Sequence, residues 1–270
     1  MTVTVRHGTA DDLAAIAALT RDRRRRLALW EPTFWNPRTG SDELHAMFLD
    51  YCIRQPGIEV RVAIEDNVIV GCVIAQPQYE QSFLDDLCVA DQRWSEIGTA
   101  LLGSLDGLRL VTCCPRRDVH ETGWLHEVGA RRVAEYHVLA LSDAPRSLKI
   151  VEASGDRRVP HVPLHTFAGG RIDPDADGAL RLGTPTVQAV ASAPMSAPIY
   201  DPGGTTTVVE SISGPDLAAA LLAVIDVCWR RGDQQLVVVT HTEDDDLRRL
   251  MRSAGSSVPV DVWEFPSRSQ

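Results

Sequence analysis

The spacing of apolar and polar residues predicts a strand and a helix at the start of the chain. Thr2 to His7 alternates between apolar and polar positions, as a half-buried strand does. Residues 9–12 read Thr-Ala-Asp-Asp, which is typical of the N-terminal cap of a helix that begins at Leu13. Arg23 to Arg26 lies near the end of that helix, where cations favour the helix dipole. We expect this basic run on a solvated face, with contact to an anion as the alternative.

A second helix is predicted from Ser41, because apolar residues recur there at intervals of three and four. The residues expected to face the core are Leu44, Met47, Phe48, Tyr51 and Cys52. Two strands follow, Ile58 to Glu65 and Val68 to Gln76. The Asp66-Asn67 pair between them is typical of a tight hairpin turn, since asparagine accepts a positive φ.

The stretch from Phe83 to Leu105 predicts a strand that leads through an exposed turn into a helix. Its first part, Phe83 to Val89, is apolar and contains Asp85 and Asp86. Helical spacing follows at Ile97, Ala100, Leu101, Leu105 and Leu108. The free N–H groups and the dipole of a helix N-terminus attract phosphate. We therefore expect residues 93–99 to form a seat for a phosphate or diphosphate group.

Three further elements are predicted before a region without regular spacing. They are a buried strand from Leu108 to Cys113, a helix from Asp118 to Val128 with Gly129 as its C-terminal cap, and a strand from Val133 to Leu141 that closes a first domain. Residues 142–182 are rich in Pro, Gly, Asp and Arg and lack long periodicity, which is typical of a linker.

The same order of elements then returns and predicts a second domain. The expected elements are strands at Val187 to Ala191 and Thr205 to Ile212, a helix opened by Gly214-Pro215-Asp216, a strand at Leu236 to Thr240, a helix at Asp245 to Ala254 and a final strand at Val258 to Phe265. Leu221 then matches Leu101, and Gly255 matches Gly129. We expect domains at residues 1–143 and 183–270, joined by a linker at 144–182.

Composition narrows the class of protein. The chain has 270 residues, of which 44% are hydrophobic, and this is enough for two domains with their own cores. A net charge of −10 argues against nucleic-acid binding and fits small cationic molecules or simple solubility. The six cysteines show no Cys-x-x-Cys spacing and the eight histidines no His-Glu-x-x-His motif, so we expect reduced thiols and no metal.

Location and origin can also be predicted from the sequence. Arg6, Asp11 and Asp12 argue against a signal peptide, and the chain has no run of about 18 apolar residues that could span a membrane. We therefore expect a cytoplasmic protein without a membrane partner. Lys149 is the single lysine among 27 basic residues, a bias that indicates a GC-rich bacterial genome.

Residues 85–102 resemble the GCN5-related N-acetyltransferase (GNAT) superfamily. The family's turn after its fourth strand reads Gln/Arg-x-x-Gly-x-Gly/Ala, and here residues 93–98 read Arg-Trp-Ser-Glu-Ile-Gly, followed by Thr-Ala-Leu-Leu. The Asp-Leu-x-Val end of the preceding strand also fits. Glu96 stands where the family has its first glycine, and Leu125 stands where it usually has a tyrosine that acts as general acid.

The resemblance implies a mixed α/β fold of two tandem GNAT-like acyl-CoA N-acyltransferase domains, the second degenerate, with acetyl-CoA as co-substrate. The residues that it assigns to acetyl-CoA are Leu87, Cys88 and Val89 at the thioester and Arg93, Ser95, Ile97, Gly98 and Thr99 at the diphosphate. It also implies that a carboxylate at Asp85 or Asp86 takes a proton from the acceptor amine. Neighbouring strand residues point to opposite faces, so only one of the two would enter the cleft, and we expect Asp86.

The loop after the first helix holds the candidate substrate-pocket residues Trp30, Glu31, Phe34 and Trp35. Bulky rings in such a loop either cover the core or line the mouth of a pocket. We expect an N-acetyltransferase that acts on a primary amine of a small molecule, as a monomer or homodimer. Two alternatives stay open. One is a non-catalytic or regulatory acyl-CoA-binding protein, and the other is different acyl-thioester chemistry such as O-acylation or decarboxylation.

Overall fold

The computed structural model describes residues 2–32, 34–37, 39–78, 81–105, 109–145, 147, 180–184, 187–191, 206–213 and 215–266. The chain forms two compact units, Met1–Arg132 with Val262–Gln270, and Val133–Asp261. The first unit therefore combines most of the N-terminal half with the last residues of the chain. The expected linker, residues 144–182, lies mostly outside the described residues.

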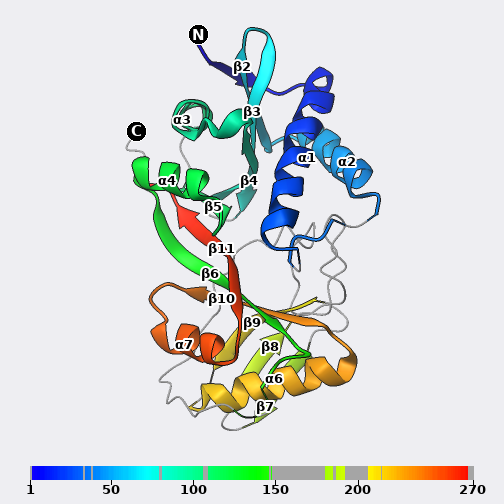
Figure 1. The fold of residues 1–270 in the computed structure, drawn as a ribbon, viewed down its shortest axis with the longest axis vertical. Helices are drawn as coiled ribbons and strands as arrows, with labels where there is room; N and C mark the ends of the chain where they lie inside the picture. The colour runs from blue at the N-terminus through cyan, green and yellow to red at the C-terminus, as the bar shows by residue number, and fades with distance from the viewer. Residues whose placement is uncertain are drawn as a thin grey trace. The chain divides into compact units, whose positions relative to one another are not determined.

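The first unit is built on a sheet with the strand order β1-β2-β3-β4-β5-β11 (Figure 1). The strands are β1 Thr4–His7, β2 Glu59–Glu65, β3 Val68–Gln78, β4 Gln81–Val89, β5 Arg109–Pro115 and β11 Ser257–Glu264, of which the end from Val262 lies in this unit. Strands β1 to β4 are antiparallel, and β5 is parallel to β4. Asp66 and Asn67 close the β2–β3 hairpin with φ angles of 49° and 64°, which confirms the predicted turn.

Helices cover both faces of this sheet (Figure 1). α1 (Leu13–Trp30) and α2 (Ser41–Arg54) lie on one face, where their core includes Ile16, Leu49, Cys52, Cys72, Ile74 and Cys88. On the other face, β4 leads through a 3₁₀ turn (Ala90–Gln92) and a π-helical turn (Trp94–Gly98) into α3 (Thr99–Gly103), and α4 (Val119–Glu127) follows β5. The core on that face includes Leu84, Leu87, Ile97, Leu101, Trp124 and Leu125.

The first three helices differ from their predictions. α1 continues to Trp30, so the basic run lies inside the helix, and α3 is shorter than predicted, although Leu108 is outside the described residues. The inward stripe expected for α2 is wrong at Met47 and Tyr51, which are 70% and 56% exposed, and right at Cys52, which is buried. The residues that α2 buries are Ser41, His45, Leu49 and Cys52. The buried histidine has a polar partner on β4, which the apolar spacing could not predict.

The second unit has the strand order β11-β6-β10-β9-β8-β7. Its further elements are β6 Arg131–Ala140, β7 Leu180–Thr184, β8 Val187–Ala191, β9 Thr206–Ser213, α6 Leu217–Arg231, β10 Gln235–His241 and α7 Asp245–Ser253. β10 is parallel to β9 and antiparallel to β6, and α6 and α7 share one apolar core. The sequence assigned β6 to the end of the first domain, but from Val133 onward it belongs to the second unit.

The two halves of the chain repeat the same order of elements. The series β3-β4-α3-β5-α4-β6 corresponds to β8-β9-α6-β10-α7-β11. α4 and α7 are each followed by a glycine with positive φ, Gly129 at 75° and Gly255 at 88°. Each is also capped by an aspartate, Asp118 and Asp244. Within the described residues the second copy shows no counterpart of the α1–α2 pair.

None of the helices in the described ranges combines the length and the apolar character needed to cross a membrane.

Candidate functional site

A β-bulge in β4 turns Asp85 and Asp86 toward the same face of the sheet. β4 holds one extra residue between two pairs with β3, Ile74–Asp85 and Cys72–Cys88. Asp85 faces the α1–α2 layer, because its partner Ile74 belongs to the core of that layer. Asp86 has a φ of 46°, a conformation that aspartate accepts more readily than most residues, and its carboxylate contacts α2. The expectation of opposite faces is wrong, because the bulge breaks the alternation.

A chain of polar contacts leads from Asp86 into α2 and α1. His45 Nε2 lies 2.6 Å from Asp86 Oδ2. Arg24 donates to His45 Nδ1 over 2.6 Å and to Asp42 Oδ1 over 2.5 Å. His45 and Arg24 are only 2% and 4% exposed. Arg24 is therefore not on the solvated face that we predicted, and His45 is a site residue that the sequence analysis missed.

Asp85 is the second carboxylate at the bulge, and few donors reach it. Its Oδ2 accepts from Gln76 Nε2 at 3.1 Å, and its Oδ1 accepts from the backbone N–H of Asp86 at 3.0 Å. Burial and the neighbouring charge of Asp86 raise the pKa of Asp85 to about 7, against the opposing effects of His45, the Asp86 backbone N–H and Arg23. This carboxylate can therefore take up or release a proton near neutral pH.

Arg23 extends from α1 to the place where β4 and β5 stop pairing. The ladder between these strands runs from Gln81–Arg109 to Leu84–Thr112. Beyond it, Arg23 donates to the carbonyl oxygen of Leu87 over 2.5 Å and lies 3.1 Å from Glu121 Oε2 on α4. Glu121 is fully buried, and burial raises its pKa to about 7 despite the charge of Arg23.

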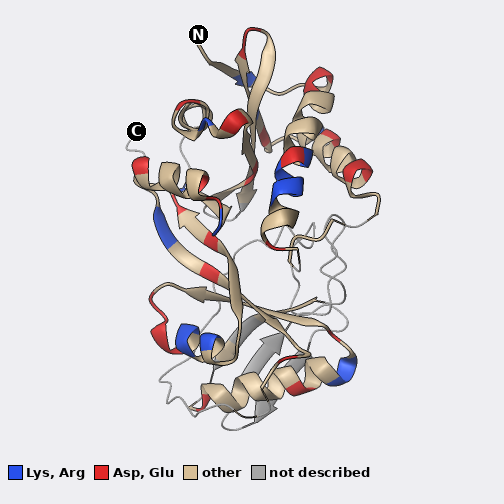
Figure 2. Ribbon diagram, viewed as in Figure 1, with Lys and Arg blue, Asp and Glu red and all other residues tan. Residues whose placement is uncertain are grey.

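The predicted diphosphate seat is a tight turn flanked by carboxylates, which Figure 2 shows among the charged residues of the unit. Arg93 donates to both oxygens of Glu65 over 2.7 and 3.0 Å and to Glu96 over 2.7 Å. Ser95 donates to Glu127 over 2.6 Å. The cation and the hydroxyl assigned to the diphosphate are thus both engaged with carboxylates of the chain itself.

The packing of two tryptophan rings against the turn explains why residue 98 is a glycine. A Cβ atom on Gly98 would lie 3.0 Å from the ring of Trp124 and 3.2 Å from that of Trp94. Those two rings stack with centroids 5.3 Å apart, and Trp124 Nε1 donates to Thr99 Oγ1 over 3.1 Å. Ile97 is fully buried beneath the turn. Gly98 therefore permits the Trp94–Trp124 stack, a role that the motif alone did not indicate.

Two of the four candidate pocket residues in the loop after α1 are buried, while Trp30 and Glu31 are half-buried. Phe34 and Trp35 are 1% and 3% exposed and meet edge to face with centroids 4.7 Å apart. Their N–H groups donate to the carbonyl of Glu31, and the carbonyl of Trp30 accepts from Arg117. This geometry favours the covering role that we left open, and the assignment of these residues to a substrate pocket stays a prediction.

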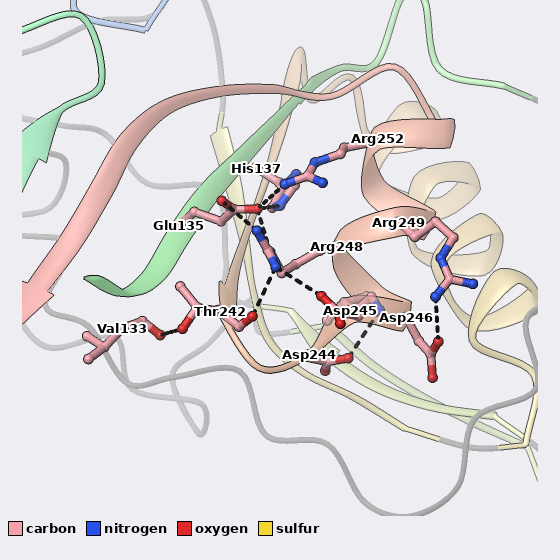
Figure 3. Close-up of polar contacts among 11 residues, drawn as sticks. Val133, Glu135, His137, Thr242, Asp244, Asp245, Asp246, Arg248, Arg249 and Arg252 are labelled. Atoms are coloured by element: carbon pink, nitrogen blue, oxygen red, sulfur yellow. Dashed lines mark hydrogen bonds and ion pairs between the residues drawn. The ribbon is translucent and has the colours of Figure 1, made fainter. Parts of the chain in front are cut away.

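The second unit holds a separate buried ion cluster between β6 and α7 (Figure 3). Glu135, which is fully buried, accepts from His137 Nε2 at 3.0 Å, from Arg248 Nε at 2.8 Å and from Arg252 at 3.1 Å. His137 Nδ1 lies 2.8 Å from the hydroxyl of Ser256. The two arginines balance the buried carboxylate, so this cluster joins α7 to the sheet.

The residues assigned to acetyl-CoA fit that molecule in part. Arg93 is about one-third exposed and Glu96 half exposed, and exposed ion pairs of this kind exchange partners readily. The turn can therefore present Arg93 to a diphosphate. Among the residues assigned to the thioester, Leu87 already accepts a hydrogen bond from Arg23 at its carbonyl oxygen. Leu125, at the position of the family's general acid, is a buried core residue that cannot donate a proton.

Solved structures share this fold over almost the whole chain. A protein named as an acetyltransferase from Thermoplasma acidophilum superposes with a TM-score of 0.57 at 16% identity, over 97% of this chain and 99% of that one. The GCN5-related N-acetyltransferase from Sphaerobacter thermophilus gives 0.54 at 14% identity, over 99% and 98% of the two chains. A tandem GNAT protein from the clavulanic acid biosynthesis pathway gives 0.52 at 13% identity, over 99% of each chain.

No protein-family model matches the sequence, and no curated protein is similar enough in sequence to be counted as a relative. The three superpositions show that the chain has the fold of two tandem GNAT-like domains, as the resemblance at residues 85–102 implied.

Proposed function

We propose that this chain is an acyl-CoA-dependent N-acetyltransferase that acts on a primary amine of a small molecule. The observation that carries the proposal is the carboxylate pair at the β4 bulge, where Asp85 and Asp86 share one face of the sheet. The bulge lies directly before the residues that the family resemblance assigns to the thioester.

The chemistry needs a neutral amine and a group that accepts its proton. An amine is protonated at neutral pH, so a nearby carboxylate attracts the cation and then receives a proton as the amide forms. A base works best when its pKa lies near the working pH, and the pKa of Asp85 is raised to about 7 by burial and by Asp86. Bound acetyl-CoA would supply the activated acetyl group, and Arg93 and the turn that follows it would hold the diphosphate.

One set of contacts favours a second candidate, a regulatory protein that binds acyl-CoA without turnover. Arg23 is held by Leu87 and the buried Glu121, and Arg93 is held by Glu65 and Glu96. Arg93 must exchange these carboxylates for the diphosphate before acetyl-CoA can occupy the assigned residues. If that exchange is unfavourable, the first domain binds weakly or slowly and does no chemistry.

The test is the release of free thiol from acetyl-CoA in the presence of a panel of small primary amines. We expect turnover with at least one amine, and a loss of about 10²-fold when the proton acceptor of the carboxylate pair is changed to asparagine. Asp91→Asn is the matched control, since Asp91 is exposed and has a similar φ of 50°. Acetyl-CoA binding without turnover for any amine would favour the regulatory candidate.

A further inference from the structure

The contacts of His45 determine which of its nitrogens carries the proton. Arg24 has only donors to offer, so His45 Nδ1 must accept the hydrogen bond that joins them over 2.6 Å. The proton of the neutral ring is therefore on Nε2, which points at Asp86 Oδ2 over 2.6 Å. Arg24 is fixed in turn by Asp42 at 2.5 Å. The chain Asp42–Arg24–His45–Asp86 thus ends in a donor aimed at one carboxylate of the pair.

α2 is oriented so that His45 faces inward and two large apolar side chains face outward. Met47 and Tyr51 stand 70% and 56% exposed on its outer face, while His45 is 2% exposed on the inner face. Leu49 and Cys52 are buried on the same face, so apolar packing and the Asp86 contact act together to orient the helix.

We propose that His45, oriented by Arg24, is a positioning residue that keeps Asp86 ionised, so that Asp85 is the carboxylate that accepts the proton of the acceptor amine. This inference rests on the proposed function and replaces our sequence-based choice of Asp86. It assigns different roles to two adjacent aspartates by the donors that reach them. Asp86 receives His45, whereas Asp85 receives one amide and one backbone N–H.

The charges around the pair support this division. Burial opposes the charge of Asp86, but the hydrogen bond from His45, together with the charges of Arg24 and Arg23, holds its pKa below the usual value. Burial and the charge of Asp86 raise the pKa of Asp85, with His45 and Arg23 opposing. Two neighbouring carboxylates on one buried face do not both ionise easily, and the one with the stronger donors takes the charge.

The other groups that face the pair are thiols and an amide, and none of them supplies a competing charge at neutral pH. Gln76 approaches from β3, and Cys72 donates weakly to the carbonyl of Asp86 over 3.7 Å. Cys52 lies on α2, and burial together with both aspartates raises its pKa to about 12, so it stays a neutral thiol. The pH dependence of the site is therefore expected to follow the carboxylate pair.

The experiment compares pH–rate profiles of the full chain and its variants, using the thiol-release assay. The wild-type rate should rise with pH through about 7, as Asp85 loses its proton. Asp85→Asn should abolish this rise and most of the turnover. Asp86→Asn should lower turnover much less than Asp85→Asn does and should move the rise to lower pH, because the charge that disfavours ionisation of Asp85 is gone. The opposite pattern for the two variants would overturn the assignment.

Three histidine variants separate positioning from mere packing. His45→Ala should move the rise to lower pH, in the same direction as Asp86→Asn, with KM for acetyl-CoA unchanged, because Asp86 then holds its charge less firmly and opposes the ionisation of Asp85 less. His45→Gln should restore the profile, since its amide can accept from Arg24 and donate to Asp86. His120→Ala, which removes an exposed histidine, should match the wild type. A His45→Ala variant with a lower Tm but an unchanged profile would overturn the inference.

A direct titration keeps this inference separable from the proposed function. In ¹³C NMR of the aspartate carboxyl groups, Asp85 should titrate near pH 7 while Asp86 stays ionised, and His45→Ala should raise the Asp86 transition. If the titration behaves so and no amine is acetylated, the acetyltransferase proposal fails and the role of His45 in keeping Asp86 ionised stands. If Asp86 titrates near pH 7 instead, the role of His45 is refuted whether or not turnover occurs.

Discussion

Arg23 and Glu121 lie 3.1 Å apart, although their helices pack on opposite faces of the same sheet. The arginine reaches through the place where β4 and β5 separate and donates on its way to the carbonyl of Leu87. Its guanidinium therefore joins the α1 layer to the α4 layer. Glu121 is fully buried, and Arg23 is the cation that balances it.

Arg23→Met should destabilise the folded protein, because it leaves the buried Glu121 carboxylate without its counter-charge. Breaking such a pair typically costs about 3–5 kcal/mol. The pKa of Glu121, already raised to about 7, should rise further, so the loss should grow as the pH rises through 7 and shrink below pH 6. Urea unfolding at several pH values measures this directly.

Two controls sharpen that experiment. Arg23→Met with Glu121→Gln removes both charges and should recover much of the stability. Arg25→Ala removes an exposed arginine two residues away and should change the free energy of unfolding little. A destabilisation by Arg23→Met that did not vary with pH would mean that packing, not charge, explains the pair.

Gly98→Ala should disturb the stack of Trp94 and Trp124. The added Cβ would lie 3.0 Å from the Trp124 ring, so the rings or the turn must shift, at about 1–3 kcal/mol of stability. Gly103→Ala is the matched control, because nothing lies within 4 Å of a Cβ there and alanine favours the helix. Thermal unfolding of both variants, with tryptophan fluorescence as the probe, should show a lower Tm for the first and an equal or higher Tm for the second.

Asp85→Asn should stabilise the protein at neutral and alkaline pH. The pKa of Asp85 is about 7 in the folded state, above the ordinary value of about 4 in the unfolded state. The stability that this carboxyl contributes is therefore complete below pH ~4 and is lost as the pH rises to ~7, at up to about 1.4 kcal/mol per pH unit. The free energy of unfolding of the variant should exceed that of the wild type more at pH 8 than at pH 5. An equal difference at the two pH values would contradict the raised pKa.

Glu96→Gln should tighten the binding of acetyl-CoA. The change removes a carboxylate from the predicted diphosphate seat and releases Arg93 from one of its two partners. Glu96 is half exposed, so we expect the Kd for acetyl-CoA to fall by only about 3- to 5-fold. Glu127→Gln, which touches Ser95 but not Arg93, should have a smaller effect. Unchanged affinity for Glu96→Gln would indicate that the diphosphate binds elsewhere.

Much of the fold could be predicted from the sequence, because it follows from local spacing. The Asp66-Asn67 hairpin, the helices capped by Asp118 and Asp244, and the repeated glycines after α4 and α7 all depend on residues close together in the chain. The pairing of β6 with β10 could not be predicted this way. It joins strands about 100 residues apart, and no local pattern specifies such a partner.

The site was harder to predict than the fold, because its polar residues break the rules of spacing. His45 sits on the inner face of α2 among apolar residues, and its partner Asp86 is turned by a bulge that has no signature in an Asp-Asp pair. Arg23 and Arg24 looked like part of a solvated run, although both end in buried contacts. The bulge on β4 places Asp86 beside His45, and the Leu87 carbonyl that follows accepts from Arg23. Arg24 in turn donates to His45.

The most direct measurement is a calorimetric titration of acetyl-CoA into the full chain, the Arg93→Ala variant and the Arg230→Ala control, which removes an exposed arginine of α6. The account predicts one molecule bound per chain, since the turn preceding α6 lacks the pattern of an arginine followed five residues later by a glycine that Arg93 and Gly98 form. It also predicts Kd weakened by about tenfold in Arg93→Ala and unchanged in Arg230→Ala. No binding, or binding that Arg93→Ala leaves intact, would contradict the assignment of this turn to acetyl-CoA.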